Sequence, residues 1–181
     1  ETPNIIGYID KNSPAELINL QVNDRVISIN NTKIDSFEDI YNFIDNENLS
    51  LDAFLFKVQR YDKIIEFRLI PEVKSIKTFI GSEKNINYLG INPLIEPIVG
   101  KVLSESPASF SGLKNNDKIL KINDVKIIGA RQVIDIVKAN DEKELKFLIL
   151  RDNNEILLEI IPKDISKSGN PKIGITFKKN R

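Results

Sequence analysis

An internal repeat is the feature of this 181-residue chain that most constrains its fold. Residues 7–34 align without a gap to residues 100–127. The identical pairs include Ser13/Ser106, Pro14/Pro107, Ala15/Ala108, Leu20/Leu113, Asp24/Asp117 and Asn30/Asn123. Because only two copies exist, and each is long enough to hold a core of its own, the repeat predicts two small domains rather than a solenoid. We expect these domains to be residues 1–94 and 95–181.

The second half of each copy also matches. Residues 60–71 correspond to residues 151–162, and the tetrapeptide YLGI at 88–91 corresponds to KIGI at 172–175. The first pair of segments has the β-branched and apolar residues of hairpin strands, next to polar turns. The polar segment 72–87 lacks periodicity, so we expect it to be a loop.

The local sequence predicts the same order of elements in both copies. Each copy begins with a short β-branched strand. A Ser-Pro-Ala segment then opens a short helix, because serine caps the free amides and proline fits the first turn. An alternating strand, a second helix and the hairpin follow. Each copy is therefore expected to be an α+β domain, a mostly antiparallel small β-barrel or sandwich with two helices.

The composition excludes several kinds of site. The chain has no His and no Cys, so it lacks the usual general base, the commonest metal ligand and any thiolate. Lys and Arg number 26, as do Asp and Glu, so no global field favours nucleic acid as a partner. No stretch approaches the roughly 20 apolar residues of a membrane span. The missing initiator Met indicates a piece of a longer protein.

Two patterns suggest catalysis, and neither is favoured. Asp24 and Asp117, one per copy, suggest the carboxylate pair of aspartic proteases, but they lack the small neighbours that place such a pair. Ser111 and Lys114 match a Ser-x-x-Lys pattern but lie where a helix ends, so they would not share a helical face. We therefore expect no catalytic residue, metal ligand or cofactor in this chain.

The repeated segment resembles bacterial PDZ domains, whose usual pattern is close to SPAxxAGLxxGDxIxxING. The second copy keeps the Ser-Pro-Ala start, Gly112-Leu113 and the alternation from Asp117 to Asn123. The first copy has Asn19 in place of the glycine, a mild change because Asn tolerates positive φ. The resemblance implies a PDZ fold for each copy. It also implies a circularly permuted order, in which the apolar-Gly-apolar strand comes last.

The tandem as a whole resembles the PDZ pair of RseP-type site-2 proteases. The resemblance rests on the LGINP stretch at 89–93, on Glu96-Pro97 and on the IGI segment at 173–175. It implies a parent zinc metalloprotease in the bacterial inner membrane, with this region on the periplasmic or extracytoplasmic face. The parent's zinc motifs cannot lie in a chain without His, so zinc is expected in the parent's membrane domain.

The PDZ resemblance also implies a peptide-binding site in each copy. PDZ domains bind an extended peptide as an added strand between a sheet edge and a helix, with its carboxylate on the amides of the glycine loop. The expected loop residues are Tyr88, Leu89, Gly90 and Ile91, and Lys172, Ile173, Gly174 and Ile175. The alternative is that each loop is a plain strand with a glycine bulge. Pro93 lacks a donor and would interrupt strand addition in the first copy only.

The second helix of each copy should line the groove. Apolar residues at i, i+4 and i+7 predict this stripe: Phe37, Tyr41 and Ile44 in the first copy, and Ala130, Ile134 and Val137 in the second. A second stripe, Ile40 with Phe43 and Val133 with Ile136, would then face the core. Because a helix packed on one face only should be polar on the other, the presence of two apolar stripes favours a groove. The alternative is that all of these residues are core.

These features lead to three functional hypotheses. The first is a regulatory tandem of a site-2 protease that gates substrate access or captures the C-terminus of a pre-cleaved substrate. Its partners would be an extended peptide or protein C-terminus, from a membrane-protein substrate, and the parent's own membrane domain. The second is the PDZ pair of an HtrA-type serine protease-chaperone. The third is a scaffold or spacer without a ligand.

Overall fold

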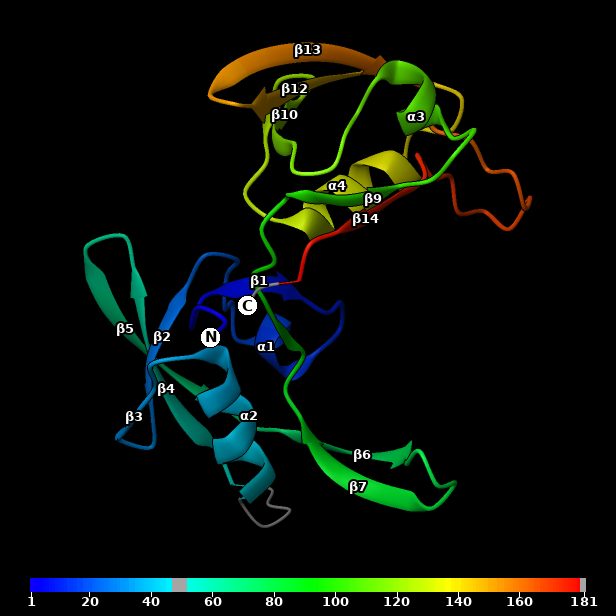
Figure 1. Ribbon diagram of the computed structural model, residues 1–181. Helices are drawn as coiled ribbons and strands as arrows, with labels where there is room; N and C mark the ends of the chain where they lie inside the picture. Colours follow the sequence, from blue (N-terminus) through cyan, green and yellow to red (C-terminus); the bar gives the residue numbers. More distant parts are fainter. Residues whose placement is uncertain (47–51, 180–181) are drawn as a thin grey trace. The chain divides into compact units, whose positions relative to one another are not determined.

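In the computed structural model, residues 1–46 and 52–179 are described (Figure 1). The chain divides into two compact units, Glu1–Leu94 and Ile95–Asn180, which we call unit 1 and unit 2. Each unit contains two helices and a set of antiparallel sheets. The prediction of two mostly antiparallel α+β domains is confirmed, although the described strands form open sheets and no closed barrel.

Unit 1 is built around a four-stranded sheet of order β3-β2-β4-β5. Two smaller sheets, β1-β8 and β6-β7, complete it. Its elements are β1 (Ile6–Ile9), α1 (Pro14–Leu17), β2 (Arg25–Ile29), β3 (Thr32–Lys33), α2 (Phe37–Asn46), β4 (Phe54–Arg60), β5 (Lys63–Leu69), β6 (Glu72–Lys77), β7 (Glu83–Tyr88) and β8 (Ile91–Pro93).

Unit 2 repeats this plan with a four-stranded sheet of order β11-β10-β12-β13 and a small sheet of β14 and β9. Its elements are β9 (Val99–Val102), α3 (Pro107–Ser111), β10 (Lys118–Ile122), β11 (Val125–Lys126), α4 (Ala130–Lys138), β12 (Leu145–Arg151), β13 (Asn154–Ile160) and β14 (Ile175–Phe177).

The last strand of each unit pairs with the first strand of the same unit. Ile91 of β8 lies opposite Ile9 of β1, and Ile175 of β14 lies opposite Val102 of β9. The side chain of Ile91 belongs to the buried cluster of unit 1, together with residues of its main sheet and of α2. This pairing is what the permuted order of strands requires.

The short helices begin as the sequence predicts. Ser13 Oγ accepts a hydrogen bond from the Glu16 amide at 3.3 Å, and Ser106 Oγ accepts one from the Ser109 amide at 3.2 Å. Gly112 ends α3 in the left-handed region, with φ of 87°. These caps fix the position of each serine, which is important for the glycine loops described below.

The expectation of a loop at residues 72–87 was wrong. This segment forms a hairpin, in which β6 and β7 pair from Glu72/Tyr88 to Lys77/Glu83. Every residue of β6 is exposed, so no alternation between a buried and an exposed face marks this strand in the sequence.

Asp24 and Asp117 have a structural role rather than the catalytic one that we considered. Each carboxylate is buried, with 1% and 0% of the residue exposed. Arg151 donates two hydrogen bonds to Asp117, at 2.8 and 2.7 Å, and Arg60 donates two to Asp24 at the same distances. The second nitrogen of Arg151 also donates to the Gly112 carbonyl at 2.8 Å. The pair therefore ties the end of α3 to the strands β10 and β12.

Candidate peptide-binding clefts

In the loop at 172–175, which we call the Gly174 loop, the carbonyls of Ile173 and Gly174 are bound to the protein, whereas the amides of these two residues are free. The Ala108 amide donates to the Ile173 carbonyl at 2.9 Å, and the Leu103 amide donates to the Gly174 carbonyl at 2.8 Å. The amides of Ile173 and Gly174 find no acceptor among the described residues. Two adjacent free amides in a turn are suited to bind an anion.

The loop at 88–91, which we call the Gly90 loop, has the same geometry. The Ala15 amide donates to the Leu89 carbonyl at 3.0 Å, and the Asp10 amide donates to the Gly90 carbonyl at 2.9 Å. In the part of the chain that the structure covers, the amides of Leu89 and Gly90 also lack an acceptor.

Both loops require glycine for two reasons. Gly90 and Gly174 have φ of +85° and +83°, in the left-handed region that side chains disfavour. A Cβ atom at Gly90 would overlap the side chain of Ser13, and one at Gly174 would overlap that of Ser106. Each glycine loop is therefore seated directly on the serine that caps the short helix.

The structure presents only the middle residue of each predicted helix stripe. Tyr41 and Ile134 occupy equivalent positions, and each is 46% exposed. Phe37 and Ile44 lie in the same buried cluster as Leu89 and Ile91. Ile40 is buried there too and Phe43 packs against the cluster, so four of the five apolar positions on α2 face the core.

Unit 2 shows the same division. Ala130 and Val137 are buried, with Val133 between them. Val137 and Ile173 belong to one buried cluster, and Ile175 packs against it. Lys172 is exposed, so the predicted residues that a ligand can reach directly are Lys172, Ile134 and the backbone of the Gly174 loop.

Unit 1 has a polar cluster beside its loop that the sequence analysis missed. Tyr88 Oη donates to Asp10 Oδ2 at 2.5 Å, and Asn92 Nδ2 donates to Asp10 Oδ1 at 2.9 Å. Lys74 Nζ lies 3.5 Å from the centre of the Tyr88 ring. Burial, and then the charges of Glu38, Asp10 and Asp45, raise the pKa of the Tyr41 phenol, so the field of Asp10 also reaches α2.

Unit 2 has a different set of side chains at the same place. The Leu103 amide takes the place of the Asp10 amide in bonding the loop glycine, and Lys172 takes the place of Tyr88. Leu103 is exposed, as is Ile134. The Gly174 loop is thus flanked by a cation and by the apolar side chain of Leu103, whereas the Gly90 loop is flanked by a carboxylate.

The polar cluster of unit 1 gives a prediction that titration can check. Burial first, and then the hydrogen bond and charge of Asp10, raise the pKa of Tyr88 to about 12. Replacing Asp10 with asparagine removes the charge, so we expect the pKa of Tyr88 to fall towards its ordinary value of about 10. The measurement is tyrosinate absorbance as a function of pH. The step that is lost in Tyr88→Phe is the titration of Tyr88. An unchanged late transition in Asp10→Asn would contradict this account.

The sign of the linked stability follows from the same shift. A group whose folded pKa is raised contributes stability that is complete below the unfolded pKa and is lost as pH rises through the folded pKa. For Tyr88 this window is pH 10 to about 12. Unit 1 should therefore lose stability in this window, and Tyr88→Phe should reduce that loss.

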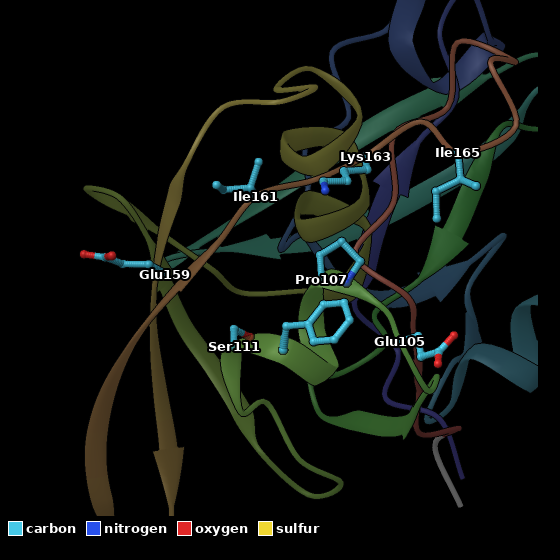
Figure 2. Close-up of a pocket in the computed structure, with 8 residues that line it drawn as sticks. Glu105, Pro107, Ser111, Glu159, Ile161, Lys163 and Ile165 are labelled. Carbon is cyan, nitrogen blue, oxygen red and sulfur yellow. The ribbon is translucent and has the colours of Figure 1, made fainter.

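A separate cleft of about 410 Å³ lies on unit 2 (Figure 2). It is lined by Pro107 and Ser111 of α3, Glu159 of β13, and Lys163 and Ile165 of the following segment. None of the residues predicted for peptide binding lines this cleft. It is therefore distinct from the Gly174 loop.

The described residues offer neither a metal site nor a membrane span. No group of three or more His, Cys, Asp or Glu among them could hold a metal ion. Within residues 1–46 and 52–179, no helix is both long and apolar enough to cross a membrane. The side chains of the described residues therefore do not fit zinc.

Comparison with known proteins agrees with the repeat. The PDZ domain family matches residues 5–52 and, in a second match, residues 72–161. The second match begins at Glu72, the first residue of β6. It therefore includes the last three strands of unit 1, among them β8, which pairs with β1 of that unit. The chain also resembles the solved PDZ domain of an SdrC-like protein from Listeria monocytogenes, with 25% identity and a TM-score of 0.41, over 44% of this chain and 84% of that one.

Several curated relatives are proteases. The chain is 35% identical over 88 residues to the "Probable protease eep" of Enterococcus faecalis, covering 48% of this chain and 21% of the relative. It is 27% identical over 170 residues to a "Putative zinc metalloprotease" of Borreliella burgdorferi, covering 83% of this chain and 36% of the relative. It is 30% identical over 82 residues to the "Regulator of sigma-W protease RasP" of Bacillus subtilis, covering 45% of this chain and 19% of the relative. The chain thus belongs to the PDZ domain family, as two PDZ domains in tandem, and is related to the site-2 zinc metalloproteases.

Proposed function

We propose that the tandem is the substrate-recognition region of a larger membrane zinc metalloprotease, and that unit 2 captures the free C-terminus of an extended peptide. The observation that carries this proposal is the pair of free amides in the Gly174 loop, beside the exposed cation of Lys172. A peptide carboxylate would accept hydrogen bonds from these amides, and its chain would extend β14 by strand addition. Zinc and the catalytic residues would lie in the parent protein, outside this chain.

The side chains around the Gly174 loop favour a peptide with an apolar last residue. Leu103 is exposed beside the loop, and Ile134 is exposed on α4, whose Val137 shares a buried cluster with Ile173 of the loop. Burying these side chains against an apolar side chain of the peptide would add a hydrophobic contribution to the free energy of binding, beside that of the backbone hydrogen bonds. Because an extended peptide loses conformational freedom on binding, we expect a dissociation constant on the order of micromolar.

Unit 1 is the weaker candidate for the same ligand. The carboxylate of Asp10 adjoins the Gly90 loop and would repel a peptide carboxylate there. Pro93 lies within β8 and has no amide to donate to an added strand. We therefore assign C-terminus capture to unit 2 and expect unit 1 to bind such peptides weakly or not at all.

The test compares two equivalent residues in the intact chain. A peptide with a free carboxylate and a terminal valine is titrated against the wild type, Ile134→Asp and Tyr41→Asp by calorimetry. Both positions are 46% exposed, and Tyr41 also packs edge-on against the ring of Phe37 at 5.2 Å between centroids. We expect Ile134→Asp to weaken binding at least about tenfold and Tyr41→Asp to leave it unchanged.

Controls separate capture from other functions. The same peptide with an amidated C-terminus should bind at least about tenfold more weakly, because it lacks the charge for the free amides. Equal binding of both peptides would contradict carboxylate capture. If neither peptide binds, the tandem would act only as a gate that excludes bulky substrates, or as a spacer.

One relative supports a second parent enzyme. The chain is 40% identical over 65 residues to "Serine protease HTRA1A" of Danio rerio, but this covers only 36% of the chain and 13% of that protein. The Borreliella relative matches 83% of the chain, which favours a zinc protease as the parent. We propose that the tandem lies on the extracytoplasmic face of a bacterial membrane. An HExxH motif upstream in the parent gene would agree with this, whereas a GNSGG motif would indicate the serine protease.

A further inference from the structure

The tip of the β6–β7 hairpin in unit 1 exposes two large apolar side chains. Phe79 is fully exposed and Ile80 is 86% exposed. Figure 1 shows β6 and β7 extending away from the other strands of unit 1. We propose that this tip inserts into the interface of a phospholipid bilayer and anchors unit 1 at a membrane surface.

The turn itself does not require these residues. The Thr78 amide donates to the Ser82 carbonyl at 2.7 Å, and the Gly81 amide donates to the Thr78 carbonyl at 2.9 Å. Gly81 supplies the positive φ, at 85°. Such turns favour Gly, Asn, Asp, Ser and Pro, so Phe79 and Ile80 are selected neither by turn geometry nor by burial. A residue choice that breaks local rules without a structural gain points to a function.

The two repeats show that the hairpin is an addition to the fold. In unit 1, residues 73–87 lie between the paired residues Glu72 and Tyr88. In unit 2, the equivalent Lys163 and Lys172 pair as an isolated bridge, with only residues 164–171 between them. Asp164 closes that shorter loop by accepting from the amides of Ser168 and Gly169. The PDZ fold is therefore complete without an extended arm.

The charges behind the tip favour an anionic lipid surface. Between residues 74 and 84 there are three lysines and one glutamate. Lys77 and Lys84 lie near the outer end of the two strands, and both are exposed. Lysine side chains at this distance from an inserted tip reach lipid phosphates while their stems remain in the apolar region.

The size of the apolar surface distinguishes a bilayer from a protein partner. Two side chains on a protruding turn provide far less than the roughly 800 Å² per partner of a stable protein interface. A bilayer interface accepts a small convex apolar tip, and binding there increases with the buried apolar area and the attraction of anionic lipids. The paired length of β6 and β7 holds the tip away from the core of unit 1.

The first experiment is sedimentation of the intact chain with vesicles. Vesicles of phosphatidylcholine alone are compared with vesicles containing about one third phosphatidylglycerol, a composition that tests the surface charge. The tip variant is Phe79→Ser/Ile80→Asn. The matched control is Phe110→Ser/Ile165→Asn, which removes two apolar side chains of unit 2 that are 79% and 80% exposed.

We expect the wild type to bind the anionic vesicles, and the tip variant to lose at least about tenfold in partition coefficient while the control retains it. Lys77→Glu/Lys84→Glu should weaken binding to anionic vesicles and have little effect on the neutral ones. The proposal is wrong if the wild type does not bind, or if the control falls as much as the tip variant.

A second measurement reports the tip directly. The chain has no Trp, so Phe79→Trp places the single indole at the tip. Adding anionic vesicles should shift its emission to the blue, and lipids brominated along the acyl chain should quench it. A shift that instead grows with protein concentration without lipid would identify a second copy as the occupant. That result would overturn the proposal.

Discussion

Replacing Arg151 with alanine is expected to lower the free energy of unfolding of unit 2 by about 3 kcal/mol, the lower end for breaking a buried ion pair. Asp117 is fully buried, and Arg151 donates to both of its oxygens. Removing the guanidinium leaves the carboxylate, among the described residues, with the Lys114 amide as its donor, at 2.7 Å. Because Arg151 is 24% exposed, some water would reach the carboxylate and keep the loss near this lower value.

Hydrogen exchange resolves this effect by unit within the intact chain. The slowest amides of β12 report unit 2, and those of β4 report unit 1, which should be unaffected by Arg151→Ala. Lys146→Ala on the exposed face of β12 serves as the control and should change stability by less than about 0.5 kcal/mol. Arg60→Ala should instead destabilise unit 1 and leave unit 2 unaffected, since Arg60 binds Asp24 in the same geometry in unit 1. Equal losses for Lys146→Ala and Arg151→Ala would contradict a special role for the pair.

The fold could be predicted because its signals are local and occur twice. The Ser-Pro-Ala cap and the alternation after Asp117 specify a helix start and a strand whatever lies around them, and the repeat supplies each of them again. The β6–β7 hairpin had no such signal, since the residues of β6 are all exposed and the strand buries no face.

The candidate site could be predicted only in part, because sequence does not show which apolar face is core. Of the apolar residues on α2, Phe37, Ile40 and Ile44 are buried, Phe43 is partly buried and Tyr41 is exposed. The two apolar stripes of each helix are equivalent in sequence, and packing against the sheet decides between them. Asp10 was missed for a different reason: its partners Tyr88 and Asn92 are about 80 residues away along the chain.

Replacing Gly174 with alanine is the second large effect that we expect, about 3 kcal/mol of destabilisation in unit 2. The left-handed backbone alone accounts for about 1–2 kcal/mol of this. The rest comes from the overlap of the new Cβ with the side chain of Ser106, which the α3 cap holds in place. Gly112 provides the matched control, since it has φ of +87° and a Cβ atom added there would meet nothing within 4 Å. Gly112→Ala should therefore show only the backbone strain.

A double variant separates steric overlap from strain. Ser106→Gly removes the Cβ that the alanine would contact but also removes the helix cap, at a loss of up to about 1 kcal/mol. If the overlap is real, Gly174→Ala and Ser106→Gly together should destabilise unit 2 by at least about 1 kcal/mol less than the sum of the single changes. Additive losses would exclude it. Peptide titration of the same variants tests whether the contact between Gly174 and Ser106 is needed for binding. We expect that it is, because this contact holds the loop in the conformation that keeps both free amides in place. On this argument, Gly174→Ala should weaken C-terminus capture even where unit 2 remains folded, and Gly112→Ala should not.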